Sequence, residues 1–262
     1  MLKIPDNFDV ALRDSKLRML KMHYDAKAGH LGGNLSCIDF LMCLYHCKID
    51  DGDEFLLSKG HSAGALYSTL WSLGLIEEND MESFSKDNSI LPAHPSGPGI
   101  PGLLFSTGSL GHGPSLCAGL AIAKKMKGEN GNIYCLCSDG EWQEGSCWEA
   151  LIFSIHHKLD NFILIIDQNG LQGFGKTDEV ISNSDLTKRL DSFGANVQTI
   201  DGHNPQVILD ALNCVKDNKF NIIVLNTVKG NGLHNAGLLE SHYLPLNENE
   251  YLSACNFIKE SK

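Results

Sequence analysis

The chain has 262 residues, 42% of them apolar, and its 21 basic and 32 acidic residues give a formal net charge of −11. This length suits one large α/β domain with a buried core, and we expect no membrane partner because no apolar run reaches about 18 residues. The acidic balance argues against a nucleic-acid partner, so a phosphorylated ligand would need positive charge from a metal ion or from backbone dipoles.

Apolar residues recur at helical spacing in three early segments, at about 8–28, 36–47 and 61–74. Two turns that combine glycine with histidine, GHLGGN and LLSKGH, lie between these helices, and the loop LPAHPSGPGIPG follows them. Pro114 then opens a helix that Gly128 ends, the usual arrangement of proline at the start and glycine after the end. The first half of the chain is therefore predicted to be helical, with histidines in its turns.

The middle of the chain has the pattern of a βαβ unit. NIYCLC predicts a short buried strand, 145–158 a helix, and NFILIID a second buried strand, and short joints between them favour a parallel sheet. A third strand, NIIVLN, follows a helix that Asn204 caps, with Pro205 in its first position. We therefore expect an α/β fold, a doubly wound and mostly parallel sheet with helices on both faces. It forms a single domain over 1–262, in which 246–262 is a C-terminal tail or a short helix.

Two polar residues stand just past the ends of the first two strands. Asp139 follows NIYCLCS and Asn169 follows NFILIIDQ. Ligands bind outside the carboxyl ends of parallel strands, and a right-handed crossover brings these two ends to one edge of the sheet. Asp139, Asn169 and a main-chain oxygen would suit Mg²⁺, which in turn would hold a diphosphate. The alternative is that Asp139 only caps the next helix and Asn169 sits in a turn, since Asp-Gly and Asn-Gly are ordinary turn dipeptides.

A longer pattern surrounds these two residues. The segment SDGEWQEGSCWEALIFSIHHKLDNFILIIDQNGLQGFG resembles the thiamine diphosphate motif, in which an acid-glycine pair is followed by a later asparagine, and it is similar in particular to the transketolase family. Four other stretches match that family in the same order: AGHLGGNLS, LSKGHSAGALY, PAHPSGPGIPGLLFSTGSLGHG and NTVKGNG. The similarity runs from about 10 to 245 and covers the diphosphate-binding half of a full-length transketolase.

The resemblance implies a thiamine diphosphate cofactor and a Mg²⁺ ion, for which Ca²⁺ or Mn²⁺ could substitute. The metal ligands would be Asp139, Asn169 and the carbonyl of Leu171. The residues implied to contact the cofactor are His61, Gly108, Ser109, Leu110, His112, Asp139, Gly140, Glu141, Asn169 and Leu171.

The resemblance also implies a set of catalytic residues: His30, His61, His94, His242 and Glu144. Histidines suit the chemistry, because ketol transfer makes and breaks alkoxides and an imidazole donates and accepts protons near pH 7. Other histidines are interpreted as ordinary: His23 and His46 on helices, His156 and His157 within a helix, and His203 in a turn.

Three positions differ from the family pattern. Ser138 replaces the glycine before the metal-binding acid, His112 stands where glutamine is common, and Ser241 replaces a large aromatic residue. These differences put the standard pentose-phosphate substrates in doubt more than the type of reaction.

The cysteines number nine and lie mostly inside apolar runs, such as Cys43, Cys47, Cys135 and Cys137. Their positions indicate reduced core thiols, and with them a cytoplasmic protein.

The family also needs a pyrimidine-binding domain, which the residues after 245 are too few to supply. We therefore expect the N-terminal subunit of a split transketolase, inactive alone and completed by a C-terminal subunit in an α₂β₂ assembly, with sugars or sugar phosphates as substrates. One alternative keeps the cofactor but acts on a modified or nucleotide-linked sugar, or makes a deoxyxylulose-type product. Another is a non-catalytic paralogue that serves as a scaffold.

Overall fold

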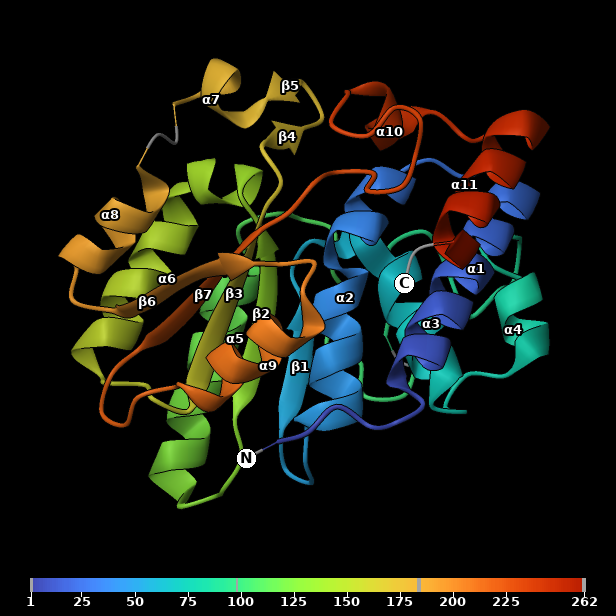
Figure 1. Ribbon diagram of the computed structural model, residues 1–262. Coiled ribbons are helices and arrows are strands. Elements are labelled where there is room, and N and C mark those ends of the chain that lie inside the picture. The colour runs from blue at the N-terminus through green and yellow to red at the C-terminus, as the bar shows by residue number, and fades with distance from the viewer. Residues whose placement is uncertain (1, 98, 183–184, 261–262) are drawn as a thin grey trace.

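A five-stranded parallel sheet of order β1-β2-β3-β7-β6 runs through the molecule (Figure 1). The computed structural model describes residues 2–97, 99–182 and 185–260. The strands of the sheet are β1 (Glu54–Leu57), β2 (Ile133–Ser138), β3 (Phe162–Gln168), β6 (Asn196–Asp201) and β7 (Asn221–Asn226).

Helices cover both faces of this sheet. One core contains residues of α1 (Phe8–Ala26), α2 (Leu31–Cys47), α3 (Ala63–Ser72), α4 (Glu78–Glu82), α9 (Pro205–Asn213) and α11 (Glu248–Glu260). The other contains residues of α5 (Gly113–Lys127), α6 (Gly145–His156) and α8 (Leu186–Ser192). Successive residues of a strand point to opposite faces, so Tyr134 lies in the first core and Cys135 in the second. The predicted doubly wound α/β fold is confirmed.

Short elements gather at the carboxyl end of the sheet, at the top of Figure 1. Each follows a strand or precedes a helix there: η1 (Gly60–Ser62), η2 (Gly140–Gln143), β4 (Leu171–Gln172), β5 (Gly175–Lys176), α7 (Thr177–Val180) and α10 (Glu240–Tyr243). Five of the predicted site residues lie within these pieces: His61, Gly140, Glu141, Leu171 and His242. None of the described helices combines the length and hydrophobicity that a segment crossing a bilayer needs.

The first helical turn of α2 lies outside the predicted range, because the sequence analysis began this helix at 36 and the structure begins it at Leu31. Two glycines in that turn lower its helix propensity, so the start of the helix could not be predicted from the sequence. A Cβ at Gly32 would lie 2.6 Å from the carbonyl oxygen of Ser241, and one at Gly33 would lie 3.2 Å from Ser62 Oγ. Glycine is thus used here for close approach of the chain.

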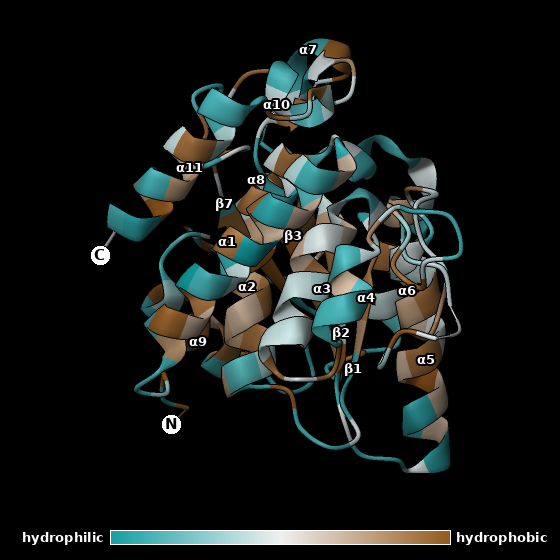
Figure 2. Ribbon diagram, turned by 90° about the vertical axis from the view of Figure 1, so that its right-hand side faces the viewer, coloured by the Kyte–Doolittle hydropathy of each residue, from teal (hydrophilic) through white to brown (hydrophobic). Residues whose placement is uncertain are grey.

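Residues Glu248–Glu260 form the helix α11. Apolar and polar residues alternate along α11 (Figure 2), and it packs its apolar side on α1. Ala254 and Ile258 are buried there, and the ring of Tyr251 stacks on Tyr24 with the centroids 4.5 Å apart. Amphipathic spacing is the physical reason that this segment is ordered against the core.

The predicted cap of α9 is confirmed. Asn204 Oδ1 accepts hydrogen bonds from the backbone N–H groups of Gln206 at 3.1 Å and Val207 at 3.2 Å, and Pro205 occupies the first turn. These bonds satisfy two N–H groups that the helix itself leaves without partners.

We predict that Asn204→Ala lowers the free energy of unfolding by about 1 kcal/mol, because both N–H groups lose their acceptor. Urea titration followed by circular dichroism measures the change. Asn204→Ser keeps an acceptor and should stay within a few tenths of a kcal/mol of the parent. An alanine variant as stable as the parent would contradict the role of the cap.

Candidate cofactor and active site

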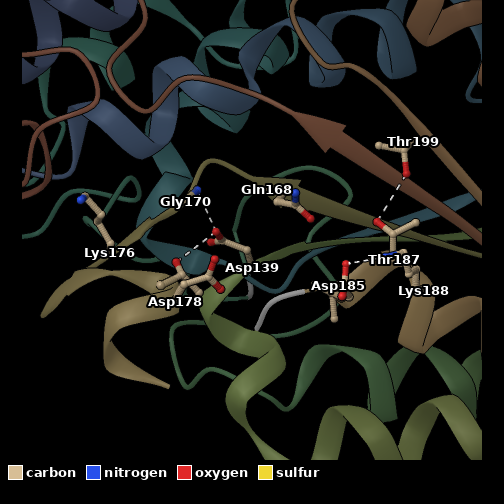
Figure 3. Close-up of a pocket in the computed structure, with 11 residues that line it drawn as sticks. Asp139, Gln168, Gly170, Lys176, Asp178, Asp185, Thr187, Lys188 and Thr199 are labelled. Carbon is tan, nitrogen blue, oxygen red and sulfur yellow. Dashed lines mark hydrogen bonds and ion pairs between the residues drawn. The ribbon is translucent and has the colours of Figure 1, made fainter. Parts of the chain in front are cut away.

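The ends of β2 and β3 meet at the carboxyl edge of the sheet. Ser138 pairs with Asp167 in the strand register, which places Asp139 beside the turn that follows β3. The carboxylate of Asp139 accepts a hydrogen bond of 2.8 Å from the backbone N–H of Gly170, the contact drawn in Figure 3. The structure thus brings Asp139 next to Asn169.

Asp139 is buried, with 3% of its surface exposed. Oδ1 accepts from Gly140 N at 2.8 Å, and Oδ2 accepts from Gly170 N and from Thr177 Oγ1 at 3.0 Å. Burial, together with the negative charge of Asp167, raises the pKa of Asp139 to about 6. A cation at this carboxylate would favour its charged form.

Asn169 and Leu171 complete the predicted set of oxygen atoms. Asn169 Oδ1 accepts from Leu171 N at 3.1 Å, and its Nδ2 donates to Asp167 at 3.2 Å. The Leu171 carbonyl accepts from Lys229 Nζ at 2.8 Å. Each of these oxygens has a second lone pair, so a carboxylate, an amide oxygen and a carbonyl remain a chemically suitable set for a hard cation such as Mg²⁺. Within the described ranges no group of three or more His, Cys, Asp or Glu residues suits a metal ion.

Two buried lysines that the sequence analysis did not single out lie beneath this edge. Lys59 is fully buried and forms an ion pair with Asp167, which is also fully buried. Burial alone would raise the pKa of Asp167, but the Lys59 ammonium together with the hydroxyls of Ser36 and Thr227 outweighs it and holds that pKa below its usual value. Lys229 is 2% exposed, and burial and the charge of Lys59 lower its pKa to about 8. Both lysines stand in quoted motifs, SKGH and VKGNG, where a charge among glycines and apolar residues was the available signal.

Four of the predicted catalytic residues form one cluster of imidazoles. His30 precedes α2, His61 lies in η1, His94 lies in the loop before α5, and His242 lies in α10. The ring centroid of His30 is 5.7 Å from that of His61, 5.8 Å from that of His94 and 4.8 Å from that of His242. The backbone N–H of His30 also donates to the carbonyl of His242 at 2.7 Å. Segments far apart in the sequence therefore meet here.

These imidazoles are neutral at pH 7. Burial is the first cause in each case and lowers the pKa values of His30 and His94, and that of His61 well below its usual range. For His242, burial and then the charge of Lys229 lower the pKa to about 3. A neutral imidazole has one donor and one acceptor, so the cluster can hold or accept protons from hydroxyl groups.

The glycine-rich turn at 108–111 lies against the cluster. Gly108 has φ 131°, and a Cβ there would lie 2.9 Å from His94 Cδ2. A Cβ at Gly60, next to His61, would lie 2.6 Å from Gly108 N. The structure therefore packs the predicted Gly108, Ser109 and Leu110 turn directly beside two of the histidines. His112 is exposed, with Nδ1 3.1 Å from the Leu110 carbonyl oxygen.

Glu141 and Glu144 occupy very different places. Glu141 is fully buried and accepts from Ser58 Oγ, from Gly111 N at 2.8 Å and from Ser138 N at 3.3 Å. Its carboxylate thus fastens the 108–111 turn to the end of β2. Glu144 is exposed at the start of α6, and among the described residues no hydrogen bond joins it to the histidine cluster.

A pocket of about 550 Å³ lies on the other side of Asp139 (Figure 3). Its remaining walls come from the ends of β3 and β6 and from α7 and α8, including Thr177, Asp178, Asp185 and Lys188. Of the predicted site residues, Asp139 alone is among those that line it. Asp139 therefore faces both the Asn169 turn and an open space large enough for a small polar group.

A family model described as "Transketolase, thiamine diphosphate binding domain" matches residues 13–256 of this chain. The chain belongs to the transketolase family. The resemblance seen in its motifs is thereby confirmed, and the domain that matches is the one that binds the cofactor in transketolases.

Relatives of similar length and longer solved transketolases both match the chain. It is 33% identical to an apulose-4-phosphate transketolase subunit of Phocaeicola vulgatus, over 97% of this chain and 95% of that protein. It is 36% identical to the 6-deoxy-6-sulfo-D-fructose transketolase subunit SqwG of a Clostridium species, over 86% of each. The structure of Campylobacter jejuni transketolase matches with a TM-score of 0.88 at 29% identity, over 97% of this chain and 43% of that one. The chain thus spans about two fifths of that solved transketolase.

A fifth histidine of this transketolase-family chain contacts the backbone next to the cluster. His23 of α1 is buried, and its Nδ1 donates to the carbonyl of Gly29, one residue before His30, at 3.1 Å. Burial lowers the pKa of His23 to about 4. This contact could not be predicted from the sequence, because a histidine on a helix carries no signal of what its ring contacts.

We predict that His23 makes the fold sensitive to acid. Its pKa in the folded chain is lowered below the usual 6.5, so the stability it preserves is complete above pH 6.5 and is lost as the pH falls toward 4. In His23→Gln the unfolding free energy should fall less steeply over that range, by about 1.4 kcal/mol per pH unit for one proton. Denaturant titrations from pH 4 to 7 measure the slope, with His157→Gln at an exposed position as the control. Equal slopes for His23→Gln and the parent would refute the assignment.

Proposed function

We propose that this chain is the thiamine diphosphate-binding subunit of a two-chain transketolase, which moves a two-carbon ketol unit from a ketose to an aldose. The observation that carries the proposal is that the oxygen set at Asp139 and the cluster of neutral imidazoles share one edge of the sheet. Lys229 lies between them: its ammonium contacts the Leu171 carbonyl, and its charge adds to the burial that lowers the pKa values of His30 and His242.

In this proposal Asp139, Asn169 and the Leu171 carbonyl hold Mg²⁺, with Ca²⁺ or Mn²⁺ as possible substitutes. The metal and the Lys229 ammonium supply the positive charge that a diphosphate needs in an otherwise acidic protein. Gly140 and the 108–110 turn let the backbone approach the diphosphate closely. Thiamine diphosphate, when bound, supplies the carbanion chemistry for breaking and making the bond beside a ketose carbonyl.

The histidines would bind the sugar and exchange protons with it. Being neutral, His30, His61, His94 and His242 can accept a proton from a sugar hydroxyl or donate one to a carbonyl oxygen. His242 is buried and His30 and His61 are partly buried, which limits water near them and strengthens the hydrogen bonds that they make, whereas His94 is exposed at the open side of the cluster. The exposed Glu144 would act at the edge of the site or toward a partner, as the family resemblance implies.

A partner chain is part of the proposal. Two relatives of similar length carry names that describe them as transketolase subunits rather than as whole transketolases. We infer that a C-terminal subunit supplies the pyrimidine-binding domain and that the two chains form an α₂β₂ assembly.

The substrate class stays open between ordinary sugar phosphates and modified sugars. The names of the two relatives refer to apulose 4-phosphate and to 6-deoxy-6-sulfo-D-fructose, which favours a modified sugar for this chain as well. His112 and Ser241, where the chain differs from the common pattern, point the same way. A scaffold without catalysis is disfavoured because its site residues would be free to vary, whereas Asp139, Asn169 and the histidine cluster are all in place.

We predict that Asp139→Asn weakens binding of thiamine diphosphate with Mg²⁺ by about 100-fold or more, since loss of an outer-shell partner alone costs ~10–100-fold. Calorimetry of the chain assembled with its partner measures the affinity, and circular dichroism checks the fold. Asp185→Asn, an acid lining the same pocket, is the matched control and should bind normally. Normal cofactor binding by Asp139→Asn would show that the metal ligands are wrongly assigned.

We further predict that the chain alone transfers no ketol unit and gains activity when it is purified with the product of the neighbouring gene. Ketose phosphates and sulfonated or branched ketoses would be compared as donors. Full activity of the isolated chain would remove the partner from the proposal, and absence of activity with every donor would favour the scaffold.

A further inference from the structure

The two turns that carry His30 and His61 meet at one buried side chain, that of Asn34. Asn34 lies in the first turn of α2 and is fully buried. Its Nδ2 donates to the carbonyl of His30 at 2.8 Å and to the carbonyl of His61 at 3.4 Å. Its Oδ1 accepts from the backbone N–H of Ala65 at 2.7 Å. One amide group thus satisfies backbone atoms on both sides of the histidine cluster.

The His30 turn needs such support. His30 has φ 63°, in the left-handed region that costs energy for a residue with a side chain. Such a conformation persists only where neighbouring contacts fix it. The His30 peptide is held by its N–H to the His242 carbonyl and by its carbonyl to Asn34, so Asn34 sets the direction of the peptide that follows the ring.

The His61 turn depends on Asn34 in a different way. Ala65 lies in the first turn of α3, where the helix leaves N–H groups without internal partners. Asn34 Oδ1 supplies an acceptor from another helix, while its Nδ2 reaches the carbonyl of His61 four residues earlier. The start of α3 and the η1 turn are therefore fastened to the start of α2.

The packing leaves Asn34 little freedom. A Cβ at Gly64 would lie 3.1 Å from Asn34 Oδ1, and a Cβ at Gly33 would lie 3.4 Å from His61 Cδ2. Only a side chain with two donor hydrogens and an acceptor at this length can make all three bonds. Aspartate has the same shape but lacks donors when ionised, and serine has a single donor.

We propose that Asn34 is a positioning residue that fixes the backbones of His30 and His61 relative to each other and so sets the distance between their rings. The inference rests on the proposed function, because it assigns Asn34 a role in the placement of two catalytic histidines. Asn34 acts through those histidines and has no part in proton transfer itself.

The main test is the substitution Asn34→Asp in the assembled enzyme. It keeps the shape and places an acceptor opposite two carbonyls, so both turns shift. A displacement of about 1 Å at reacting groups costs ~100-fold in rate, and we expect a fall in kcat of that size. The KM for the sugar should change little by comparison, because the sugar-binding groups remain present.

Asn221→Asp is a matched control. Asn221 is also fully buried, its Nδ2 donates to the carbonyls of Lys216 at 3.0 Å and Lys219 at 2.9 Å, and its Oδ1 accepts from Lys216 N at 2.9 Å. It lies at the amino end of β7, away from the histidines. Both variants should lose thermal stability, and Asn34→Asp alone should lose kcat. Equal kcat values for the two variants would overturn the proposal.

Asn34→Ser keeps the test decisive if the aspartate variant does not fold. A serine hydroxyl in a helix donates to the carbonyl four residues earlier, here that of His30, but cannot also hold the His61 turn. We expect a kcat between those of the parent and Asn34→Ala. A serine variant equal to the parent, or equal to the alanine variant, would contradict the shared anchoring.

A measurement without catalysis separates this inference from the proposed function. The ¹³Cε1 signals of the His30 and His61 rings, recorded on the full chain labelled at histidine, should move in Asn34→Asp and stay in Asn221→Asp. If those signals move but the assembled enzyme transfers no ketol unit, the proposed function fails and the positioning role stands. If they stay, the positioning role fails.

Discussion

The carboxyl edge of the sheet depends on one buried carboxylate, that of Asp167. It lies in β3, yet it receives the ammonium of Lys59 after β1 and the hydroxyls of Ser36 in α2 and Thr227 after β7. Asn169 Nδ2 adds a fourth donor. Removing one partner from a buried ion pair leaves an uncompensated charge, at a cost of about 3–5 kcal/mol. The relative positions of three strand ends and one helix are thus fixed by a single fully buried group.

This arrangement also explains how an acidic protein presents a locally positive site. The sequence analysis expected positive charge from a metal or from backbone dipoles, whereas the structure adds two buried lysines. Lys59 is balanced by Asp167, while Lys229 contacts the neutral Leu171 carbonyl and has the lower pKa. Burial is the first cause that lowers the pKa values of His61 and His242, and the charges of these lysines add to it. In the proposed function the same charges would also attract the diphosphate.

Much of the sheet could be predicted, but its edges could not. Strands β2, β3 and β7 are buried on both faces, so they appear as continuous apolar runs. The edge strands were missed, because EFLL of β1 is very short and NVQTID of β6 alternates with polar residues that are partly exposed. That Asp139 lies beside the Asn169 turn could be predicted from the positions of both residues after strands. The contacts of Asp167, Lys229 and Asn34 could not be predicted, because a buried polar residue takes its meaning from partners distant in sequence.

The helix α11 attaches the segment that follows β7 to the first helix of the chain. The segment between β7 and α11 carries both Lys229 and His242. At its far end α11 packs on α1, where the rings of Tyr24 and Tyr251 stack. Near the start of the segment, Gly230 N bonds to the carbonyl of Gly32 at 2.9 Å. The segment is therefore held against the start of α2 and attached to the first helix at its far end. Proteolysis near α11, or a competing surface that displaced α11 from α1, would therefore free Lys229 and His242 together and leave the sheet intact.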